Sequence, residues 1–171
     1  MNDVTIRQYR PHSSDVEECR TLWVELTQRH RELYDDPTIG GDAPGLYFDE
    51  HLARVGPERI WVAQQGLKIV GLVGLIVKGR EAEVEPIVVA PAHRDRGIGR
   101  ALLNHMVEEA QALQVRYLSV KPVARNLEAI SFYYDFGFRT LGEIEMFMEL
   151  GTPAPGTWKP GPELFGHSFK Y

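Results

Sequence analysis

Three arginines and two glycines are clustered directly after an apolar, β-branched segment in the middle of the chain. Residues 84–90 read Val-Glu-Pro-Ile-Val-Val-Ala, and residues 94–101 then read Arg-Asp-Arg-Gly-Ile-Gly-Arg-Ala before an amphipathic run. A helix that begins at such a turn presents backbone N–H groups without internal acceptors, and its dipole adds partial positive charge there. Glycine has no Cβ to keep an anion away from these groups. The pattern therefore indicates a binding site for a phosphorylated ligand.

Two common phosphate-binding motifs do not fit these residues. A P-loop requires Gly-Lys-Ser/Thr at its end, and this tripeptide does not occur in the chain. A dinucleotide fingerprint requires Gly-x-Gly-x-x-Gly after the first strand, but Leu102 stands at the third glycine position and the segment lies in the middle of the chain. Both motifs are excluded by specific residues.

The sequence resembles the GCN5-related N-acetyltransferases (GNAT) in two motifs. Residues 94–99 match the acetyl-CoA signature Arg/Gln-x-x-Gly-x-Gly/Ala at each fixed position. Residues 126–138 resemble the family's Asn-x-x-Ala-x-x-x-Tyr-x-x-x-Gly-Phe stretch. The resemblance covers about residues 4–150. It implies an enzyme that transfers the acetyl group of acetyl-CoA to a primary amine by direct attack in a ternary complex.

The resemblance also implies how acetyl-CoA is held. The pyrophosphate is expected on the amides from Arg94 or Asp95 through Ala101, and the pantetheine arm is expected along residues 87–89. An N–H of Val88 or Val89 would polarise the thioester carbonyl. The implied cofactor-binding residues are Ile87, Val88, Val89, Arg94, Asp95, Arg96, Gly97, Ile98, Gly99, Arg100, Ala101, Asn126 and Tyr133. An ordinary capped helix with solvated arginines is the alternative interpretation.

Two side chains are candidates for proton transfer. Tyr133 occupies the family's tyrosine position, which implies that it protonates the leaving thiolate, while the adjacent Tyr134 is expected to be a packing or surface residue. Glu85 is the candidate base that takes the proton of the amine, and Glu83 or a water relay is the alternative. The period of a strand predicts that both glutamates share a face with residues 87 and 89. The structural alternative for Tyr133 is a core aromatic residue, and the alternative for the two glutamates is a solvated or salt-bridged face.

Other potentially reactive residues receive structural interpretations. Cys19 lies on an apolar helical stripe without a neighbouring histidine, so we expect a buried thiol and no acetyl-cysteine intermediate. The histidines show no paired spacing and are interpreted as surface or packing residues; they include His30, His51, His93, His105 and His167. The acceptor amine is expected to contact the segment from Tyr34 to Val55 and the last strand. The candidate contacts in these segments are one tyrosine and five acidic residues: Tyr47, Asp42, Asp49, Glu50, Glu143 and Glu145.

The elements that position these residues form a mixed α/β pattern. Apolar periodicity predicts helices within 14–33, 48–55, 97–113 and 127–136, and strands at 4–9, 59–64, 67–78, 81–90, 117–120 and 139–150. The resemblance implies a GNAT fold, a single mixed sheet with helices on both faces, in which the strand that contains Pro86 carries a bulge and diverges from the next strand. We expect a GNAT domain at 1–150 and, at 151–171, an irregular aromatic tail that packs on the core or on a partner subunit.

Composition narrows the class of protein. The chain has 171 residues, 43% of them hydrophobic and 25% charged, and its net charge of −5 argues against nucleic-acid binding. We expect no signal peptide, and no apolar run reaches the ~20 residues that a membrane span needs. One cysteine and no Cys/His cluster predict a cytoplasmic protein without metal. The family allows a homodimer. A catalytically silent acyl-CoA sensor and a transferase for longer acyl groups are the alternative functions.

Overall fold

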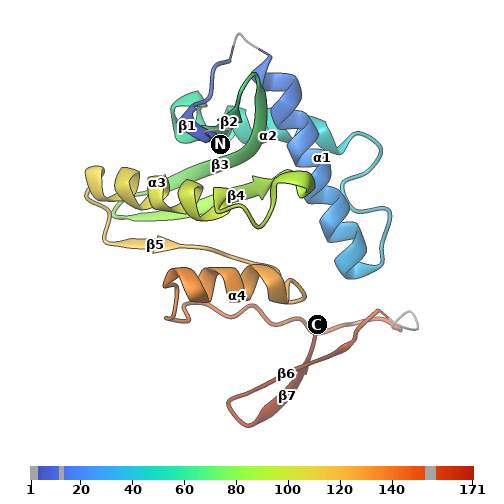
Figure 1. The fold of residues 1–171 in the computed structure, drawn as a ribbon. Coiled ribbons are helices and arrows are strands. Elements are labelled where there is room, and N and C mark those ends of the chain that lie inside the picture. Colours follow the sequence, from blue (N-terminus) through green and yellow to red (C-terminus); the bar gives the residue numbers. More distant parts are fainter. Residues whose placement is uncertain (1–3, 12–13, 153–156) are drawn as a thin grey trace. The chain divides into compact units, whose positions relative to one another are not determined.

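The computed structural model describes residues 4–11, 14–152 and 157–171, and the chain forms two compact units, Met1–Lys121 and Pro122–Tyr171. Figure 1 shows the elements of both units. The first unit contains β1 (Val4–Gln8), α1 (Asp15–Tyr34), α2 (Tyr47–Val55), β2 (Ile60–Gln65), β3 (Lys68–Lys78), β4 (Glu81–Val89), α3 (Ile98–Ala112) and β5 (Tyr117–Ser119). The second unit contains α4 (Leu127–Phe136), β6 (Pro160–Leu164) and β7 (His167–Lys170).

The first unit is built on one five-stranded sheet in the order β1-β2-β3-β4-β5. Neighbouring strands are antiparallel except β4 and β5, which are parallel because α3 connects them. A Cβ on Gly71 would meet Leu102 of α3, whereas a Cβ on Gly74 would meet His51 of α2. Residues three apart in a strand point to opposite faces, so α2 and α3 cover opposite faces of the sheet. The expected mixed sheet with helices on both faces is confirmed.

The core of this unit joins α1 and α2 to the sheet. Fully buried side chains there include Cys19 of α1, Phe48 of α2 and Leu72 of β3, around which Trp23 also packs. The Cys19 thiol has no exposed surface, and burial raises its pKa. The prediction of a buried cysteine is confirmed.

A β-bulge interrupts the pairing of β3 with β4 next to Pro86. Val73 pairs with Ile87 and Leu75 pairs with Val84, so Gly74 alone lies opposite residues 85 and 86. An added Cβ at Gly74 would overlap the backbone carbonyl oxygen of Glu85. The bulge that we expected at Pro86 is confirmed, and Gly74 is the residue that leaves room for it.

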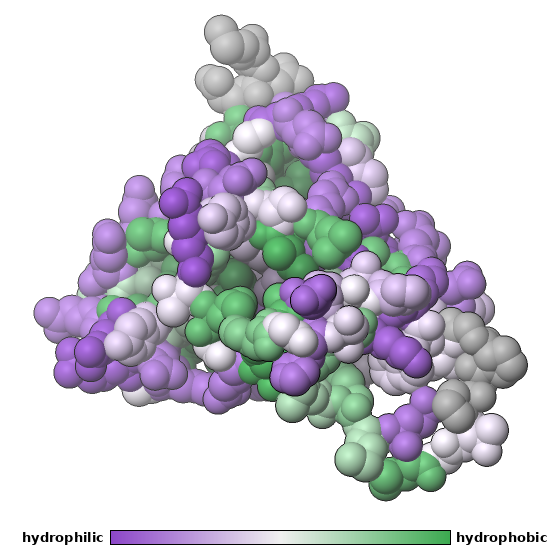
Figure 2. All heavy atoms as spheres, turned by 90° about the horizontal axis from the view of Figure 1, so that it is seen from below, coloured by the Kyte–Doolittle hydropathy of each residue, from purple (hydrophilic) through white to green (hydrophobic). Residues whose placement is uncertain are grey.

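The strand that we expected at 139–150 is not formed. No strand is assigned there, and large apolar side chains of the segment are exposed. The exposed residues include Leu141, Ile144, Met146, Phe147, Met148 and Leu150. Figure 2 shows hydrophobic residues at the surface on the face that it draws. Alternating polarity predicted a strand, but a strand also needs neighbouring backbone groups, and within the second unit the hairpin of β6 and β7 pairs with itself.

The chain after Leu150 is more regular than expected. β6 and β7 form an antiparallel hairpin whose turn, Phe165-Gly166, has two positive φ angles of 54° and 77°. This is the two-residue turn that strand twist favours. Residues 153–156 of the expected irregular tail lie outside the described residues. Arg125 holds the ends of the hairpin, since its Nη2 donates to the carbonyls of Thr157 (2.6 Å) and Tyr171 (2.7 Å).

We expect Arg125→Met to destabilise the second unit. Arg125 is buried, and its loss leaves two carbonyl groups without these charge-assisted hydrogen bonds, which costs about 2–4 kcal/mol of the free energy of unfolding. Urea unfolding followed by tryptophan fluorescence measures the change. Arg139→Met, which removes an exposed guanidinium over the ring of Tyr134 in the same unit, is the control and should cost no more than about 1 kcal/mol. Equal effects of the two variants would contradict this role of Arg125, as would unchanged melting after deletion of residues 152–171.

Candidate functional site

The N-terminus of α3 is formed by a glycine in the left-handed conformation. Gly97 has φ 79°, and it caps α3 without a side-chain hydrogen bond. The amide of Ala101 makes the first helical bond, to the carbonyl of Gly97 at 3.0 Å. The amides of Ile98 and Gly99 precede that bond and have no intrahelical acceptor. These two groups, with the dipole of a 15-residue helix behind them, are suited to bind an anion.

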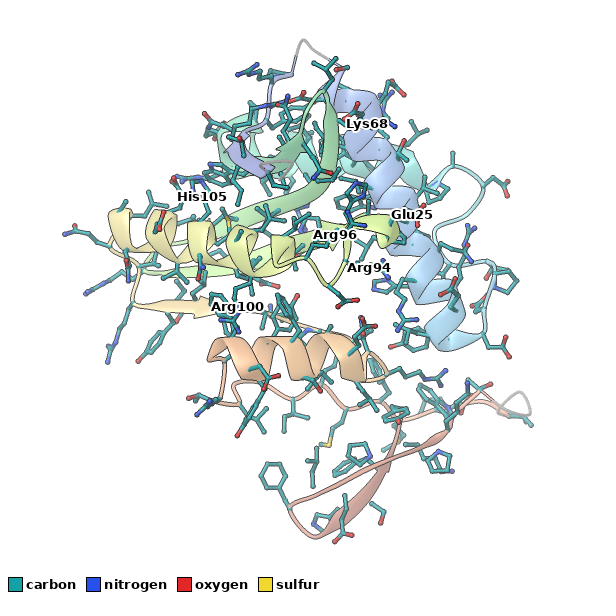
Figure 3. All side chains as sticks on the ribbon, in the orientation of Figure 1. Glu25, Lys68, Arg94, Arg96, Arg100 and His105 are labelled. Atoms are coloured by element: carbon teal, nitrogen blue, oxygen red, sulfur yellow. The ribbon has the colours of Figure 1, made fainter. Side chains whose placement is uncertain are left out.

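Arginines surround this N-terminus. Arg94 and Arg96 lie on the turn that leads into α3, and Arg100 lies in the first turn of the helix (Figure 3). Arg94 also ties the turn to the sheet, because its Nε donates to the carbonyl of Val89 at 3.1 Å. Asp95, between them, adopts a left-handed conformation with φ 57°. The structure therefore brings the predicted turn residues and the start of α3 together.

The edge of β4 that faces β5 is unpaired along most of its length. β5 pairs only with residues 81–83, and among the described strands none pairs with β4 on this side beyond Glu83. The amide of Ala90 donates to Val70 of β3, so the backbone of Val88 also faces β3 and that of Val89 faces away. The bond from Arg94 to the Val89 carbonyl agrees with this direction. Of the two amides that the sequence left open, Val89 is therefore the one on the unpaired edge.

The prediction that Glu83 and Glu85 share a face with Ile87 and Val89 is wrong for both glutamates. Val89 pairs with Gly71 on the α3 face, whereas Glu85 reaches Arg54 of α2, with 2.8 Å between Oε1 and Nη2. The bulge at residues 85–86 shifts the alternation of side chains by one residue, which the two-residue period did not include. Glu83 pairs with Ile76 and binds Lys121 through Oε2 at 2.9 Å.

His51, which the sequence analysis interpreted as a surface or packing residue, is a packing residue close to Glu85. It is buried, its ring lies 5.2 Å from that of Trp23, and its Nδ1 lies 3.0 Å from Nη2 of Arg54. Burial, and then the charge of Arg54, lower the pKa of His51. The signal was present in the sequence, because His51 lies at helical spacing from Phe48 and Val55 and so falls on the buried stripe of α2.

Tyr133 and Tyr134 have different environments in the second unit. Tyr133 packs edge-on to Phe138, with ring centroids 5.9 Å apart, and burial raises its pKa to about 12. Tyr134 is exposed beneath the guanidinium of Arg139, as expected for a surface residue. Asn126 caps α4, since its side chain accepts the amide of Ala129 at 3.1 Å.

The acidic residues expected at the acceptor end belong to both units. Asp49 pairs with Arg20 at 2.9 Å and so ties α2 to α1. Asp42 and Glu50 are exposed in the first unit. Glu143 and Glu145 are exposed on the irregular segment of the second unit.

Neither a metal centre nor a membrane span is found in the part of the chain that the structure describes. In residues 4–11, 14–152 and 157–171, no three His, Cys, Asp or Glu side chains are grouped to hold an ion. Over the same ranges, every helix is too short or too polar to cross a bilayer.

Comparison with known proteins gives the family. The acetyltransferase (GNAT) family profile matches residues 19–138. N-alpha-acetyltransferase RimI of Mycobacterium tuberculosis is 36% identical over 121 residues, which cover 67% of this chain and 73% of that protein. The [ribosomal protein bS18]-alanine N-acetyltransferase of Escherichia coli K12 is 30% identical over 111 residues, which cover 57% and 74%. The crystal structure of a GNAT-family acetyltransferase from Staphylococcus aureus Mu50 has the same fold, with a TM-score of 0.68 at 18% identity over 88% of this chain and 94% of the other. The signature at the start of α3, the mixed sheet and these matches together show that the chain belongs to the GNAT family of acetyltransferases.

Proposed function

We propose that the protein transfers the acetyl group of acetyl-CoA to a primary amine by direct attack within a ternary complex. The observation that carries this proposal is the adjacency of two features in the first unit. The backbone N–H groups of Ile98 and Gly99, which have no intrahelical acceptor, can bind a pyrophosphate. The unpaired edge of β4 ends just before them in the chain. A pantetheine arm carries amide groups that can pair with such an edge as a strand would.

This geometry supports the proposed cofactor contacts in the first unit, and the family motif supports those of Asn126 and Tyr133 in the second. The amides of Ile98 and Gly99 bind the pyrophosphate, and Arg94, Arg96 and Arg100 supply the compensating charge. The remaining proposed contacts are the backbone of Ile87, Val88, Val89, Asp95, Gly97 and Ala101, and the side chains of Asn126 and Tyr133. The N–H of Val89 donates to the thioester oxygen, where negative charge develops in the transition state.

The proposed transfer needs one proton acceptor and one hydrogen-bond donor. The amine nitrogen attacks the thioester carbon and passes its proton to the carboxylate of Glu85, and the C–S bond then breaks. Tyr133, at the position that the family motif implies, donates a hydrogen bond to the departing sulfur, and the released thiolate takes its proton from solvent. A pKa of about 12 keeps the phenol protonated at neutral pH, so its O–H is available for this hydrogen bond. Cys19 has no exposed surface, which supports direct attack over an acetyl-cysteine intermediate.

Steady-state kinetics with a panel of acceptors test the proposal. The panel contains peptides with free N-terminal amines, which the names of the relatives suggest, together with lysine side chains and small polyamines. We expect release of the coenzyme A thiol with at least one class, and intersecting initial-rate lines when both substrates are varied. Parallel lines would contradict direct attack. Binding of acetyl-CoA without turnover on any amine would support the silent sensor instead. The use of longer acyl-CoA donors remains an alternative, and a cytoplasmic location remains a prediction. The expected homodimer is also a prediction, which analytical sedimentation tests.

Tyr133→Phe is expected to lower kcat about tenfold while leaving the affinity for coenzyme A nearly unchanged. The effect is modest because a thiol with a pKa of about 8.5 leaves readily even without a donor. Tyr134→Phe is the matched control and should retain full kcat, because that side chain is exposed under Arg139. In the wild type, no loss of rate from deprotonation of this phenol is expected below pH ~11. A Tyr133→Phe variant as active as the control would refute the donor role.

A further inference from the structure

His51 lies next to the backbone of residue 85 and is linked to the side chain of Glu85 through Arg54. Nδ1 of His51 lies 3.0 Å from Nη2 of Arg54, and the same Nη2 lies 2.8 Å from Oε1 of Glu85. On the other side of the ring, Nε2 lies 3.1 Å from the position that a Cβ on Gly74 would occupy. The backbone carbonyl oxygen of Glu85 is also next to that position. One imidazole thus lies between the backbone of residue 85 and the guanidinium that binds its side chain.

The neighbours of the ring determine its tautomer. A guanidinium has only donors, so Nδ1 must offer its lone pair to Arg54, and the proton of the neutral ring is on Nε2. Nε2 is buried and makes no hydrogen bond of full geometry within the described residues, although the nearby Glu85 carbonyl favours a proton there. Burial disfavours a second proton, which agrees with the lowered pKa of His51.

Without this ring, the ion pair of Arg54 with Glu85 would be an ordinary surface contact. The two side chains are 58% and 43% exposed, and exposed pairs of this kind hold their geometry weakly. His51, in contrast, is 4% exposed and is packed against Trp23, so it is a fixed anchor for the guanidinium. An anchored donor selects one arrangement of a mobile carboxylate.

We propose that His51 is a positioning residue that holds Arg54 against Glu85 and thereby orients the carboxylate that receives the proton of the acceptor amine. This inference rests on the proposed function for the role of Glu85. It assigns a task to a buried polar side chain of α2 that the transfer reaction does not itself use. The bulge opposite Gly74 places the Glu85 backbone next to the ring.

The arrangement should depend on pH in one direction. The charged groups that act on the ring are Arg54 from α2 and Glu85 from β4, and α1 contributes the uncharged ring of Trp23. A proton on Nδ1 removes the acceptor and places an imidazolium beside a guanidinium. Since the folded-state pKa of His51 is lowered, this occurs only below its usual value of about 6.5, and the contact is intact above that pH.

The matched variants are His51→Asn and His51→Gln. The Asn oxygen falls near the place of Nδ1 and can accept from Arg54, whereas the Gln amide reaches toward the place of Nε2. We expect His51→Gln to lower kcat about tenfold with the affinity for coenzyme A unchanged, and His51→Asn to stay within about threefold of wild type. The wild type should lose rate in acid through a titration that His51→Asn lacks. His30→Asn, which removes another partly buried histidine, is the control and should keep the wild-type acid profile. Equal losses in the Asn and Gln variants would overturn the proposal.

A second measurement does not depend on catalysis. The coupling of Arg54 with Glu85 is obtained from the unfolding equilibria of the wild type, Arg54→Met, Glu85→Ala and the double variant, and the same cycle is then repeated in the His51→Gln background. We expect a coupling of about twofold to fivefold in the unfolding equilibrium constant with His51 present, and its loss in the His51→Gln background. Coupling that persists unchanged in that background would overturn the proposal. If no amine is acetylated by the wild type, the proposed function fails, while this cycle still decides whether His51 positions the pair.

Discussion

Gly97→Val is expected to lower the affinity for coenzyme A about 100-fold, equivalent to about 2.7 kcal/mol of binding free energy. Gly97 has φ 79°, a conformation that a β-branched residue adopts only at a cost. Relaxation of that strain moves the amides of Ile98 and Gly99, and the new side chain lies where the pyrophosphate would approach them. Each lost charge-assisted hydrogen bond contributes about 1.5–3 kcal/mol, so the loss of one or two accounts for the effect. Isothermal titration with coenzyme A measures it.

Gly79→Val separates this effect from backbone strain. Gly79 also has a positive φ, of 62°, and like Gly97 it has no atom within 4 Å of an added Cβ. It lies in the turn between β3 and β4, away from the start of α3. Both variants should lose similar free energy of unfolding, about 1–2 kcal/mol, while only Gly97→Val weakens binding. Equal affinities of the two variants for coenzyme A would show that the start of α3 does not bind the cofactor.

Glu85→Gln is expected to lower kcat about 100-fold, the lower end of the contribution of a general base. The substitution keeps the size of the side chain and a hydrogen-bond acceptor for Arg54, so the fold and the affinity for coenzyme A should change little. The loss should be smaller with acceptors whose amine is less basic, because they arrive with less of their population protonated. Stopped assays of acetylated product over several acceptors measure this trend.

Glu83→Gln is the control for the choice between the two glutamates. Glu83 lies two residues earlier in β4, and its carboxylate is already bound by Lys121 at 2.9 Å. It should keep kcat within about threefold of wild type, as expected for loss of a partly exposed ion pair. A larger loss in Glu83→Gln than in Glu85→Gln would exchange their roles, and full activity in both would favour a water relay.

Local patterns predicted most elements of the first unit correctly. The periodicity of apolar residues predicted the helix α3 and the strands β2, β3 and β4. The signature at residues 94–99 located the turn before α3. The direction of Glu85 could not be predicted, because a bulge depends on what β3 can accommodate at Gly74 and not on β4 alone. The expected strand at 139–150 failed for a related reason, since alternation describes the faces of a strand but not its partner. His51 was interpreted as a surface or packing residue, and it does pack; its contact with Arg54, which also binds Glu85, could not be predicted because it depends on the position of β4.

The complete burial of Cys19 has a practical consequence for following the reaction. The chain has one cysteine, and that thiol has no exposed surface and a raised pKa, so it is a poor partner for disulfide or maleimide reagents. A chromogenic aromatic disulfide can therefore report liberated coenzyme A continuously, with little background from the folded polypeptide. Because Cys19 is unreactive, two cysteines introduced one in each compact unit can be labelled with dyes selectively. The distance between the dyes would then measure how the units are arranged before and after acetyl-CoA is added.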